Sequence, residues 1–388
     1  MSEKVKLGII GIGNQGSTYA RRLARENWVP DIQLVAIADI NPDRIAWARE
    51  NVSADIAYFD DALAMLDSGL LDACVVSVPH YDHPKYVIEC LRRGIHVLCE
   101  KPAGVYTEQV REMNAEAEKH PETVFAMMFN QRTNCVYRKM RELIQSGRYG
   151  RVRRANWLIT NWYRSQYYYD SGDWRATWSG EGGGVLLNQC PHQLDLWQWI
   201  LGLPKKVQSF MHYGQWHDIE VEDDVTTYME YEDGHTGVFI TSTGDPHGTN
   251  RFVVQMYGAQ RVVENDTLYL TELEQLEQDW TKTNTQPFGS VPGKEIVVET
   301  DGLNPQHQGV FEAFAAAILR GEPLIAGGEE GLRGLTLSNA MHLSAFLGRP
   351  VEIPFDEHLY YEELMKRVAS SRRKAPAKAV FAGTEGTY

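Results

Sequence analysis

The sequence contains no apolar segment near the roughly 20 residues that a membrane-spanning helix requires, so we expect no membrane partner. It has only five cysteines, an odd number without closely paired spacing, and reduced thiols are their simplest interpretation. The apolar run at the N-terminus is too short for a secretory signal and ends in glycines rather than at a cleavage site. These absences lead us to expect a cytoplasmic protein.

Basic residues are also scarce, with 38 Lys and Arg against 52 Asp and Glu, which gives a formal net charge of −14. A nucleic-acid-binding protein needs a basic face, so this balance speaks against a nucleic-acid partner. It gives no general attraction to anionic substrates either, although a local Lys or Arg can still supply one. The 388 residues exceed the usual size of one hydrophobic core, so we expect two domains.

The first part of the chain alternates strand-like and helix-like segments, which is typical of a parallel sheet covered by helices. The expected strands lie within residues 4–13, 32–40, 72–79, 95–102 and 123–130. The expected helices lie within residues 17–28, 42–52, 83–94 and 107–120. We predict an α/β dinucleotide-binding domain of the Rossmann type over residues 1–130.

The pattern then changes to alternating apolar and polar residues, which predicts a mostly antiparallel sheet. The expected strands are 151–163, 206–213, 223–232, 235–243 and 250–258, with EDGH (232–235) as a hairpin turn. Long helices are expected only at 308–320 and 330–347. We predict an α+β domain for substrate binding and oligomerisation over residues 131–356, followed by a lightly anchored tail over 357–388.

The segment GIGNQG contains Gly11, Ile12, Gly13, Asn14, Gln15 and Gly16, and fits the G-x-G-x-x-G pattern between a strand and a helix. Gly11 permits a tight turn, Gly13 allows close approach of a pyrophosphate, and Gly16 allows the helix to pack on the strand. Asp39 ends the second strand, where an acidic side chain binds the ribose hydroxyls. Because this carboxylate would repel a 2′-phosphate, NAD is favoured over NADP, although Arg44 lies nearby in sequence.

HVLCEKP (96–102) places Glu100 and Lys101 at the carboxyl end of a predicted parallel strand, where ligands bind. Pro102 keeps Lys101 out of helical geometry and so fixes the direction of its side chain. An ammonium held there would hydrogen-bond a substrate hydroxyl and stabilise the alkoxide formed on proton loss. The alternative is a solvated lysine at the start of a loop.

GIIGIGNQG, IADINPDR, SVPHYDH and HVLCEKPAG, in this order, resemble the Gfo/Idh/MocA oxidoreductases. The resemblance covers nearly the whole chain, since GGGVLLNQCPHQLDLWQWILG and PVEIPFD also match. It implies a Rossmann domain, an open C-terminal sheet that builds a homodimer or homotetramer, and oxidation or reduction of sugars, inositols and similar polyols. It further implies a catalytic lysine at Lys101, with a Lys-Pro bond that is often cis. Four residues are implied to line the nicotinamide side, namely Ser77, Pro79, His80 and His83.

GEGGGVLLNQCPHQLD (180–195) departs from the usual family pattern, because Asn188 stands where most members have Asp. Asn cannot accept a proton, so that role falls to His192, four residues later. An Asn-Gln pair before the His also resembles some sugar 3-dehydrogenases of the family, which implies C3 as the oxidation site. In a helix Asn188 and His192 share a face, and Asp195 follows His192 by three residues. Pro191 either kinks that helix or begins a new one.

Other interpretations of this stretch stay open. Asp195 is expected to bind substrate or to orient the imidazole, and the alternative is that it caps local structure. His192 is alternatively a buried core histidine. A metal site is not expected, because Cys190 and His192 supply only two of the three or four ligands that zinc needs. Cys190 is interpreted as a small packing residue.

Residues 157–178 hold eight aromatic side chains in 22 positions, too many for a loop to bury completely. With Arg164 and Arg175 beside them they would suit the apolar face and hydroxyl rim of a sugar. An oligomer interface is the alternative. Within the loop the expected substrate contacts are Trp162, Arg164, Tyr169, Trp174 and Arg175. Asn130 or Arg132, at the crossing between the domains, is expected to contact cofactor or substrate.

Together these features predict an NAD-dependent dehydrogenase that oxidises a secondary hydroxyl of a pyranose. Lys101 would lower the pKa of the hydroxyl, and His192 would take its proton. One alternative is an NAD-recycling glycosidase, in which transient oxidation at C3 acidifies the C2 proton and allows elimination. Another is a non-catalytic, NAD-linked sensor. The sequence leaves open which sugar is used and in which direction the reaction runs.

Overall fold

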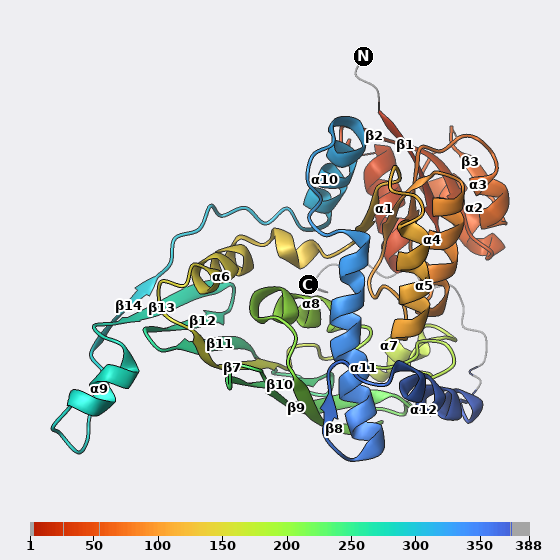
Figure 1. Ribbon diagram of the computed structural model, residues 1–388. Coiled ribbons are helices and arrows are strands. Elements are labelled where there is room, and N and C mark those ends of the chain that lie inside the picture. The colour runs from red at the N-terminus through yellow and green to blue at the C-terminus, as the bar shows by residue number, and fades with distance from the viewer. Residues whose placement is uncertain (1–3, 26, 54, 373, 375–388) are drawn as a thin grey trace.

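The computed structural model describes residues 4–25, 27–53, 55–372 and 374. Two sheets organise the chain, one in each domain, and Figure 1 shows helices packed on both. None of the helices in these ranges is long and apolar enough to cross a membrane.

The first sheet is wholly parallel, with strand order β3-β2-β1-β4-β5-β6. Its strands are β1 (Val5–Ile10), β2 (Ile32–Ala38), β3 (Ala57–Phe59), β4 (Ala73–Val76), β5 (His96–Cys99) and β6 (Phe125–Met127). Its helices are α1 (Asn14–Arg25), α2 (Pro42–Asn51), α3 (Ala62–Leu66), α4 (His83–Arg92) and α5 (Thr107–Ala117). β4 and β6 are buried at every residue, as expected of a parallel sheet covered on both faces. The predicted Rossmann domain is confirmed, and β3 and α3 are additions to it.

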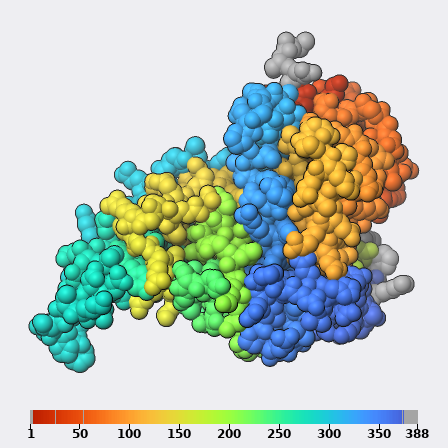
Figure 2. Space-filling view, in the orientation of Figure 1, coloured from red at the N-terminus to blue at the C-terminus, as the bar shows by residue number. Residues whose placement is uncertain are grey.

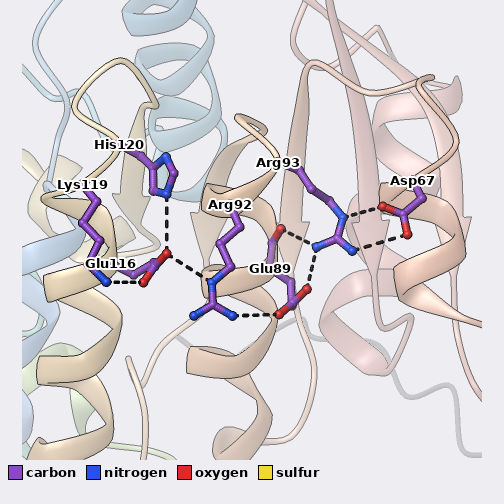
Figure 3. Close-up of polar contacts among 7 residues, drawn as sticks. All are labelled: Asp67, Glu89, Arg92, Arg93, Glu116, Lys119 and His120. Carbon is purple, nitrogen blue, oxygen red and sulfur yellow. Dashed lines mark hydrogen bonds and ion pairs between the residues drawn. The ribbon is translucent and has the colours of Figure 1, made fainter.

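Charged side chains link the outer helices of this domain (Figure 3). Arg93, directly after α4, pairs with Asp67, directly after α3, with 2.6 Å between Nε and Oδ1. Arg92 of α4 pairs with Glu116 of α5 at 3.1 Å. Glu89 joins the two arginines, so the ion pairs run across three consecutive helices.

The second sheet has nine strands in the order β14-β13-β12-β11-β7-β10-β9-β8-β15. Their bounds are β7 (Val152–Ile159), β8 (Lys206–Tyr213), β9 (Glu222–Glu230), β10 (Thr236–Ser242), β11 (Asn250–Met256), β12 (Ala259–Glu264), β13 (Thr267–Leu273), β14 (Gly293–Val297) and β15 (Val351–Glu352). Every pair is antiparallel except β7 with β10. The five predicted strands and the hairpin turn are confirmed, whereas the last strands, from β12 onward, were not predicted.

Helices cover one face of this sheet: α6 (Cys135–Gln145), α8 (Pro191–Leu201) and α11 (Gly331–Leu347). On the covered face Trp157 stacks on Phe252 with ring centroids 4.3 Å apart. On the other face large side chains remain exposed, including Phe210 (61%) and Tyr228 (41%). Two short helices, α7 (Gln166–Asp170) and α9 (Glu277–Thr283), lie in the connections, and α9 projects at the far end of the molecule (Figure 2).

The chain returns to the first domain before it ends. α10 (Gln306–Arg320) packs against α1, with the rings of Phe311 and Tyr19 5.0 Å apart. Arg320 pairs with Asp31 at 2.8 Å, and Figure 2 shows this segment against the N-terminal domain. The predicted continuous second domain over residues 131–356 therefore needs correction, because its residues 306–320 complete the first domain.

The predicted tail also needs correction. Residues 357–369 form helix α12 (Glu357–Ala369), in which Tyr360 and Leu364 are completely buried. A helix anchored by two core side chains, which packs on both α11 and α5, is part of the folded protein rather than a lightly held tail. Residues 373 and 375–388 of that prediction lie outside the described residues.

Candidate active site

The loop between β1 and α1 has the backbone geometry that a dinucleotide needs. Gly11 has φ +85°, and a Cβ there would lie 2.4 Å from the carbonyl oxygen of Ser77. A Cβ at Gly16 would lie 2.0 Å from the carbonyl oxygen of Gly11, so only glycine lets α1 pack this closely. Gly13 has nothing within 4 Å of its Cβ position, which leaves its backbone open to a pyrophosphate. Asn14 begins α1 directly behind it, so the helix N-terminus faces the same space.

Asp39 closes this corner of the site at the end of β2. Its carboxylate accepts hydrogen bonds from the backbone N–H of Ile12 at 2.9 Å and of Asn41 at 2.8 Å. Arg44 donates to the carbonyl oxygen of Ile12 at 3.0 Å and so lies at the same corner. These residues fit a dinucleotide whose ribose hydroxyls contact Asp39, and that contact stays a prediction.

The segment after β4 lies beside the other candidate residues. Pro79 directly precedes a 3-10 turn (His80–Asp82), and the side chains of both His80 and His83 are buried. Nδ1 of His80 lies 3.1 Å from the carbonyl oxygen of Glu181, and Nδ1 of His83 lies 2.6 Å from that of Pro102. Burial lowers the pKa of His80 well below its usual range and that of His83 to about 4. Both rings are therefore neutral at neutral pH and are held by backbone contacts.

Lys101 lies at the carboxyl end of β5, as predicted, and its peptide bond to Pro102 is cis. Its Nζ donates to the backbone carbonyl of Asn188 at 2.9 Å. Burial lowers the pKa of Lys101, while the neighbouring carboxylate of Glu100 opposes that shift. Glu100 is itself buried and accepts hydrogen bonds from the hydroxyl of Tyr19 and the backbone of Lys101. The lysine is thus held at the centre of the site rather than solvated.

The stretch before His192 differs from the helical expectation. α8 begins at Pro191, so this proline starts a new helix, and Asn188 lies in the turn before it. The shared helical face predicted for Asn188 and His192 is therefore absent. The turn still brings both residues to Lys101, since Asn188 accepts its hydrogen bond and the charge of Lys101 acts on His192.

The glycine-rich part of this stretch is fixed by Glu222 of β9. The backbone N–H groups of Gly184 and Leu186 donate to its carboxylate at 2.8 and 3.0 Å. A Cβ at Gly184 would lie 2.0 Å from the carbonyl oxygen of Glu222, so the glycine permits this close approach. His342 of α11 lies 3.1 Å from the same carboxylate. The sheet and α11 thus set the path of the chain into the site.

His192 is buried in the first turn of α8. Burial lowers its pKa well below the usual range, and the charges of Lys101 and His307 lower it further. His307, in the first turn of α10, is likewise buried, which lowers its pKa to about 3, and Lys101 contributes. His192 is therefore neutral at neutral pH, the form of imidazole that can accept a proton.

Asp195 lies in α8 three residues after His192, as predicted, but its carboxylate is already paired. Its carboxylate oxygens accept hydrogen bonds from Nε and Nη2 of Arg132 at 2.8 and 2.7 Å, and the pair is buried. Gln198 donates to the same carboxylate at 2.9 Å, and Arg132 also contacts Glu330 at 2.7 Å. Asp195 and Arg132 therefore join α8 to the crossing between the domains, and we withdraw their expected contacts with substrate.

The aromatic loop divides into buried and accessible parts. Trp162 is 7% and Tyr169 is 3% exposed, and the hydroxyl of Tyr169 donates to Thr243 at 2.8 Å. Both rings pack in the core, and their contact with substrate stays a prediction. Trp174 is partly buried and lies edge-on to His80 with ring centroids 5.5 Å apart. The accessible part of the loop thus meets the segment predicted to line the nicotinamide.

Asn130 lies at the crossing between the domains and is completely buried. Its Nδ2 donates to Oε1 of Gln306 at 2.5 Å, and Gln131 donates to the same oxygen at 3.1 Å. The contact joins the end of the Rossmann strands to the start of α10. Contact between Asn130 and the cofactor stays a prediction.

Sequence reasoning missed Glu181, Tyr168 and His307. Glu181 is buried, and its carboxylate accepts hydrogen bonds from the side chain of Asn188 and from the backbone of Ala176. Tyr168 donates to Oδ1 of Asn188 at 3.2 Å. Glu181 and Tyr168 lay within stretches that the sequence marks as chemically rich, whereas His307 carries no local signal.

Two family profiles match this chain. The NAD-binding Rossmann-fold profile of the oxidoreductase family matches residues 5–128, and the GFO/IDH/MocA C-terminal domain profile matches residues 137–260. Together with the glycine loop and the Lys101 site, these matches define an oxidoreductase with an NAD-binding domain. The chain belongs to the Gfo/Idh/MocA family.

Individual relatives agree with that assignment. The chain is 23% identical over 355 residues to myo-inositol 2-dehydrogenase of Thermotoga maritima, covering 90% of this chain and 98% of that protein. It is 28% identical over 251 residues to D-glucoside 3-dehydrogenase of Escherichia coli, covering 60% and 68%. The structure of the WlbA dehydrogenase from Chromobacterium violaceum, in complex with NADH and UDP-GlcNAcA, superposes with a TM-score of 0.78 at 25% identity. That superposition covers 92% of this chain and 98% of WlbA.

Proposed function

We propose that this protein is an NAD-dependent dehydrogenase that oxidises a secondary hydroxyl, at C3, of a pyranose or its glycoside. The observation that carries the proposal is the position of Lys101, whose ammonium is fixed 2.9 Å from the carbonyl of Asn188 and acts on His192. A cation and a neutral imidazole at the carboxyl end of the Rossmann strands suit the removal of a hydroxyl proton. Similarity to D-glucoside 3-dehydrogenase supports C3, and similarity to myo-inositol 2-dehydrogenase supports a ring polyol.

The residues divide the work according to their charges. Lys101 donates a hydrogen bond to the substrate hydroxyl and stabilises the negative charge that forms as its proton leaves. His192 accepts that proton, because it is neutral when the substrate enters. Asn188 has no proton-accepting group and orients the hydroxyl through its amide. Bound NAD supplies the hydride acceptor, C4 of the nicotinamide.

The test is the absorbance of NADH when purified protein is mixed with NAD and a panel of pyranoses, methyl glycosides and inositols. An increase with one sugar class, together with a 3-keto product identified by NMR, is the expected result. Release of an aglycone without net NADH would instead establish the NAD-recycling glycosidase. Protein that binds NADH but produces neither signal with any sugar would overturn both enzymes and favour the sensor.

A further inference from the structure

Arg175 lies at the edge of the candidate site, between two aromatic rings. Its guanidinium carbon is 4.7 Å from the ring centre of Trp174 and 4.6 Å from that of Tyr168. Its Nη1 donates to the hydroxyl of Tyr168 at 2.8 Å, and that hydroxyl donates to Asn188. Arg175 is therefore connected to the residues around Lys101 through a single tyrosine.

Arg164 approaches the same tyrosine. Its guanidinium carbon lies 5.3 Å from the ring centre of Tyr168, and its Nη1 donates to the carbonyls of Trp162 and Tyr163 at 3.4 and 2.9 Å. The charges of both arginines help to lower the pKa of Lys101, behind the larger effect of burial. Three cations thus act on one small region of a chain with net charge −14.

Both arginines donate hydrogen bonds through Nη1. The opposite edge of each guanidinium, formed by Nε and Nη2, faces no hydrogen-bond acceptor among the described residues. Within the described part of the chain, neither Arg164 nor Arg175 donates a hydrogen bond from Nε or Nη2, and neither forms an ion pair. Each of the two arginines is partly buried rather than enclosed in the core. The Nε and Nη2 groups form the planar fork that matches the two oxygens of a carboxylate or phosphate.

Three other arginines of this molecule bind a carboxylate through the Nε and Nη2 groups together. Arg132 binds Asp195 through Nε and Nη2, and Arg111 binds Glu357 through the same pair of nitrogens. Arg93 binds Asp67 in this way, as the two parallel contacts in Figure 3 show.

The two carboxylates of the site, Glu100 and Glu181, already accept hydrogen bonds from other groups. Glu100 accepts from Tyr19 and from the backbone of Lys101, and Glu181 accepts from Asn188 and the backbone of Ala176. Both carboxylates are buried. The interaction of Glu181 with Arg175 is electrostatic, without a hydrogen bond between the two side chains. A neutral sugar would therefore leave two partly buried guanidinium forks without a hydrogen-bonded anion.

We propose that the substrate of this site is a pyranose that carries an anionic group, a carboxylate or a phosphate, and that Arg164 and Arg175 bind that group. The inference rests on the proposed function, because it takes the pyranose from there and adds the charge. It makes these two arginines determinants of specificity.

The test compares three glycosides that differ only in charge. Methyl glucopyranoside is neutral, its C6-oxidised uronate carries a carboxylate, and its 6-phosphate carries a phosphate. The NADH-loaded enzyme is titrated with each by calorimetry, and the NAD-loaded enzyme is assayed for turnover with each. We expect one anionic glycoside to bind and react with at least about tenfold lower Kd and KM than the neutral one, the effect of charge-assisted hydrogen bonds.

Variants assign the effect to the arginines. R164Q and R175Q are expected to lose about tenfold or more in affinity for the anionic glycoside while NADH affinity is unchanged. R175K keeps the charge but loses the planar fork, so we expect it to bind the anion more weakly than the native protein. The matched control is R154Q, which removes an exposed arginine on β7 and is expected to change nothing.

The outcomes separate this inference from the proposed function. If the neutral glycoside is oxidised with a kcat/KM equal to or higher than that of the anionic glycosides, the anionic substrate is overturned. The proposed dehydrogenase activity is then still supported. Tight binding of an anionic glycoside that R175Q abolishes, with no turnover, would support the anionic ligand and overturn the dehydrogenase. If none of the three glycosides binds to the enzyme, the inference is overturned.

Discussion

The ammonium of Lys101 donates to the backbone carbonyl of Asn188 at 2.9 Å, across 87 residues of sequence. The hydrogen bond joins the carboxyl end of β5, in the parallel sheet of the Rossmann domain, to the turn that precedes α8. It gives the lysine one backbone acceptor, and the protonated form of Lys101 then has further N–H groups to offer a substrate.

Replacement of Lys101 by Met should reduce kcat by about a hundredfold or more, because the developing negative charge loses its hydrogen-bond donor. NADH affinity, measured by fluorescence titration, should change little. Lys85, exposed on α4, provides the control, and K85M should behave as the native protein. Near-normal turnover of K101M would remove Lys101 from the reaction.

The pH profile of kcat/KM should report the buried state of His192. Only neutral imidazole accepts the proton, so activity is lost as pH falls through the pKa of His192. Because burial lowers that pKa well below its usual value of about 6.5, activity should persist as pH falls through about 6.5. The measurement is initial rate against pH at constant ionic strength, with circular dichroism at each pH as the control for unfolding. An acidic limb centred near pH 6.5 would contradict the assignment.

Substitution of Asp39 by Asn should increase the use of NADP relative to NAD. The change removes the negative charge that repels a 2′-phosphate, and Arg44 already reaches the carbonyl of Ile12 beside it. The ratio of kcat/KM for the two cofactors is the measurement. An unchanged ratio would show that Asp39 does not face the ribose.

Substitution of Asp195 by Asn should lower the free energy of unfolding by about 3 kcal/mol, because the buried guanidinium of Arg132 loses the carboxylate that binds both Nε and Nη2 and keeps only Glu330. Asp301 pairs with Arg138 at 2.9 Å on the surface and provides the matched control. D301N should cost less than about 1 kcal/mol. Urea denaturation followed by fluorescence compares the two variants, and equal losses would contradict the structural role.

Much of the fold was predictable because local sequence determined it. The Rossmann strands are short apolar runs that end in glycine, proline or charge, and the hairpin turn of the second domain contains Asp and Gly. β14 was missed because all five of its residues are exposed, so its sequence lacks apolar alternation. β12 was missed although it alternates, because its inward side chains include Arg261, a residue that predicts an exposed position but is completely buried.

The candidate site was predictable where one motif contains the chemistry, as for Lys101 and the turn before His192. It was not predictable where distant segments meet. His307 enters the site from α10, and the Arg132–Asp195 pair joins residues 63 apart. No spacing rule relates such residues. The sequence could therefore indicate that Asp195 is able to bind substrate or orient the imidazole, but it could not show that its carboxylate is paired with Arg132.

The return of α10 to the first domain determines the order in which the chain can fold during synthesis. Tyr19 and Asp31 emerge from the ribosome early, but their partners Phe311 and Arg320 follow nearly 300 residues later. The apolar surface of α1 that α10 covers therefore stays exposed while strands β7 to β14 of the second sheet are being translated. The Rossmann domain begins first and is completed late, so a chain truncated after the first sheet would present this surface to chaperones.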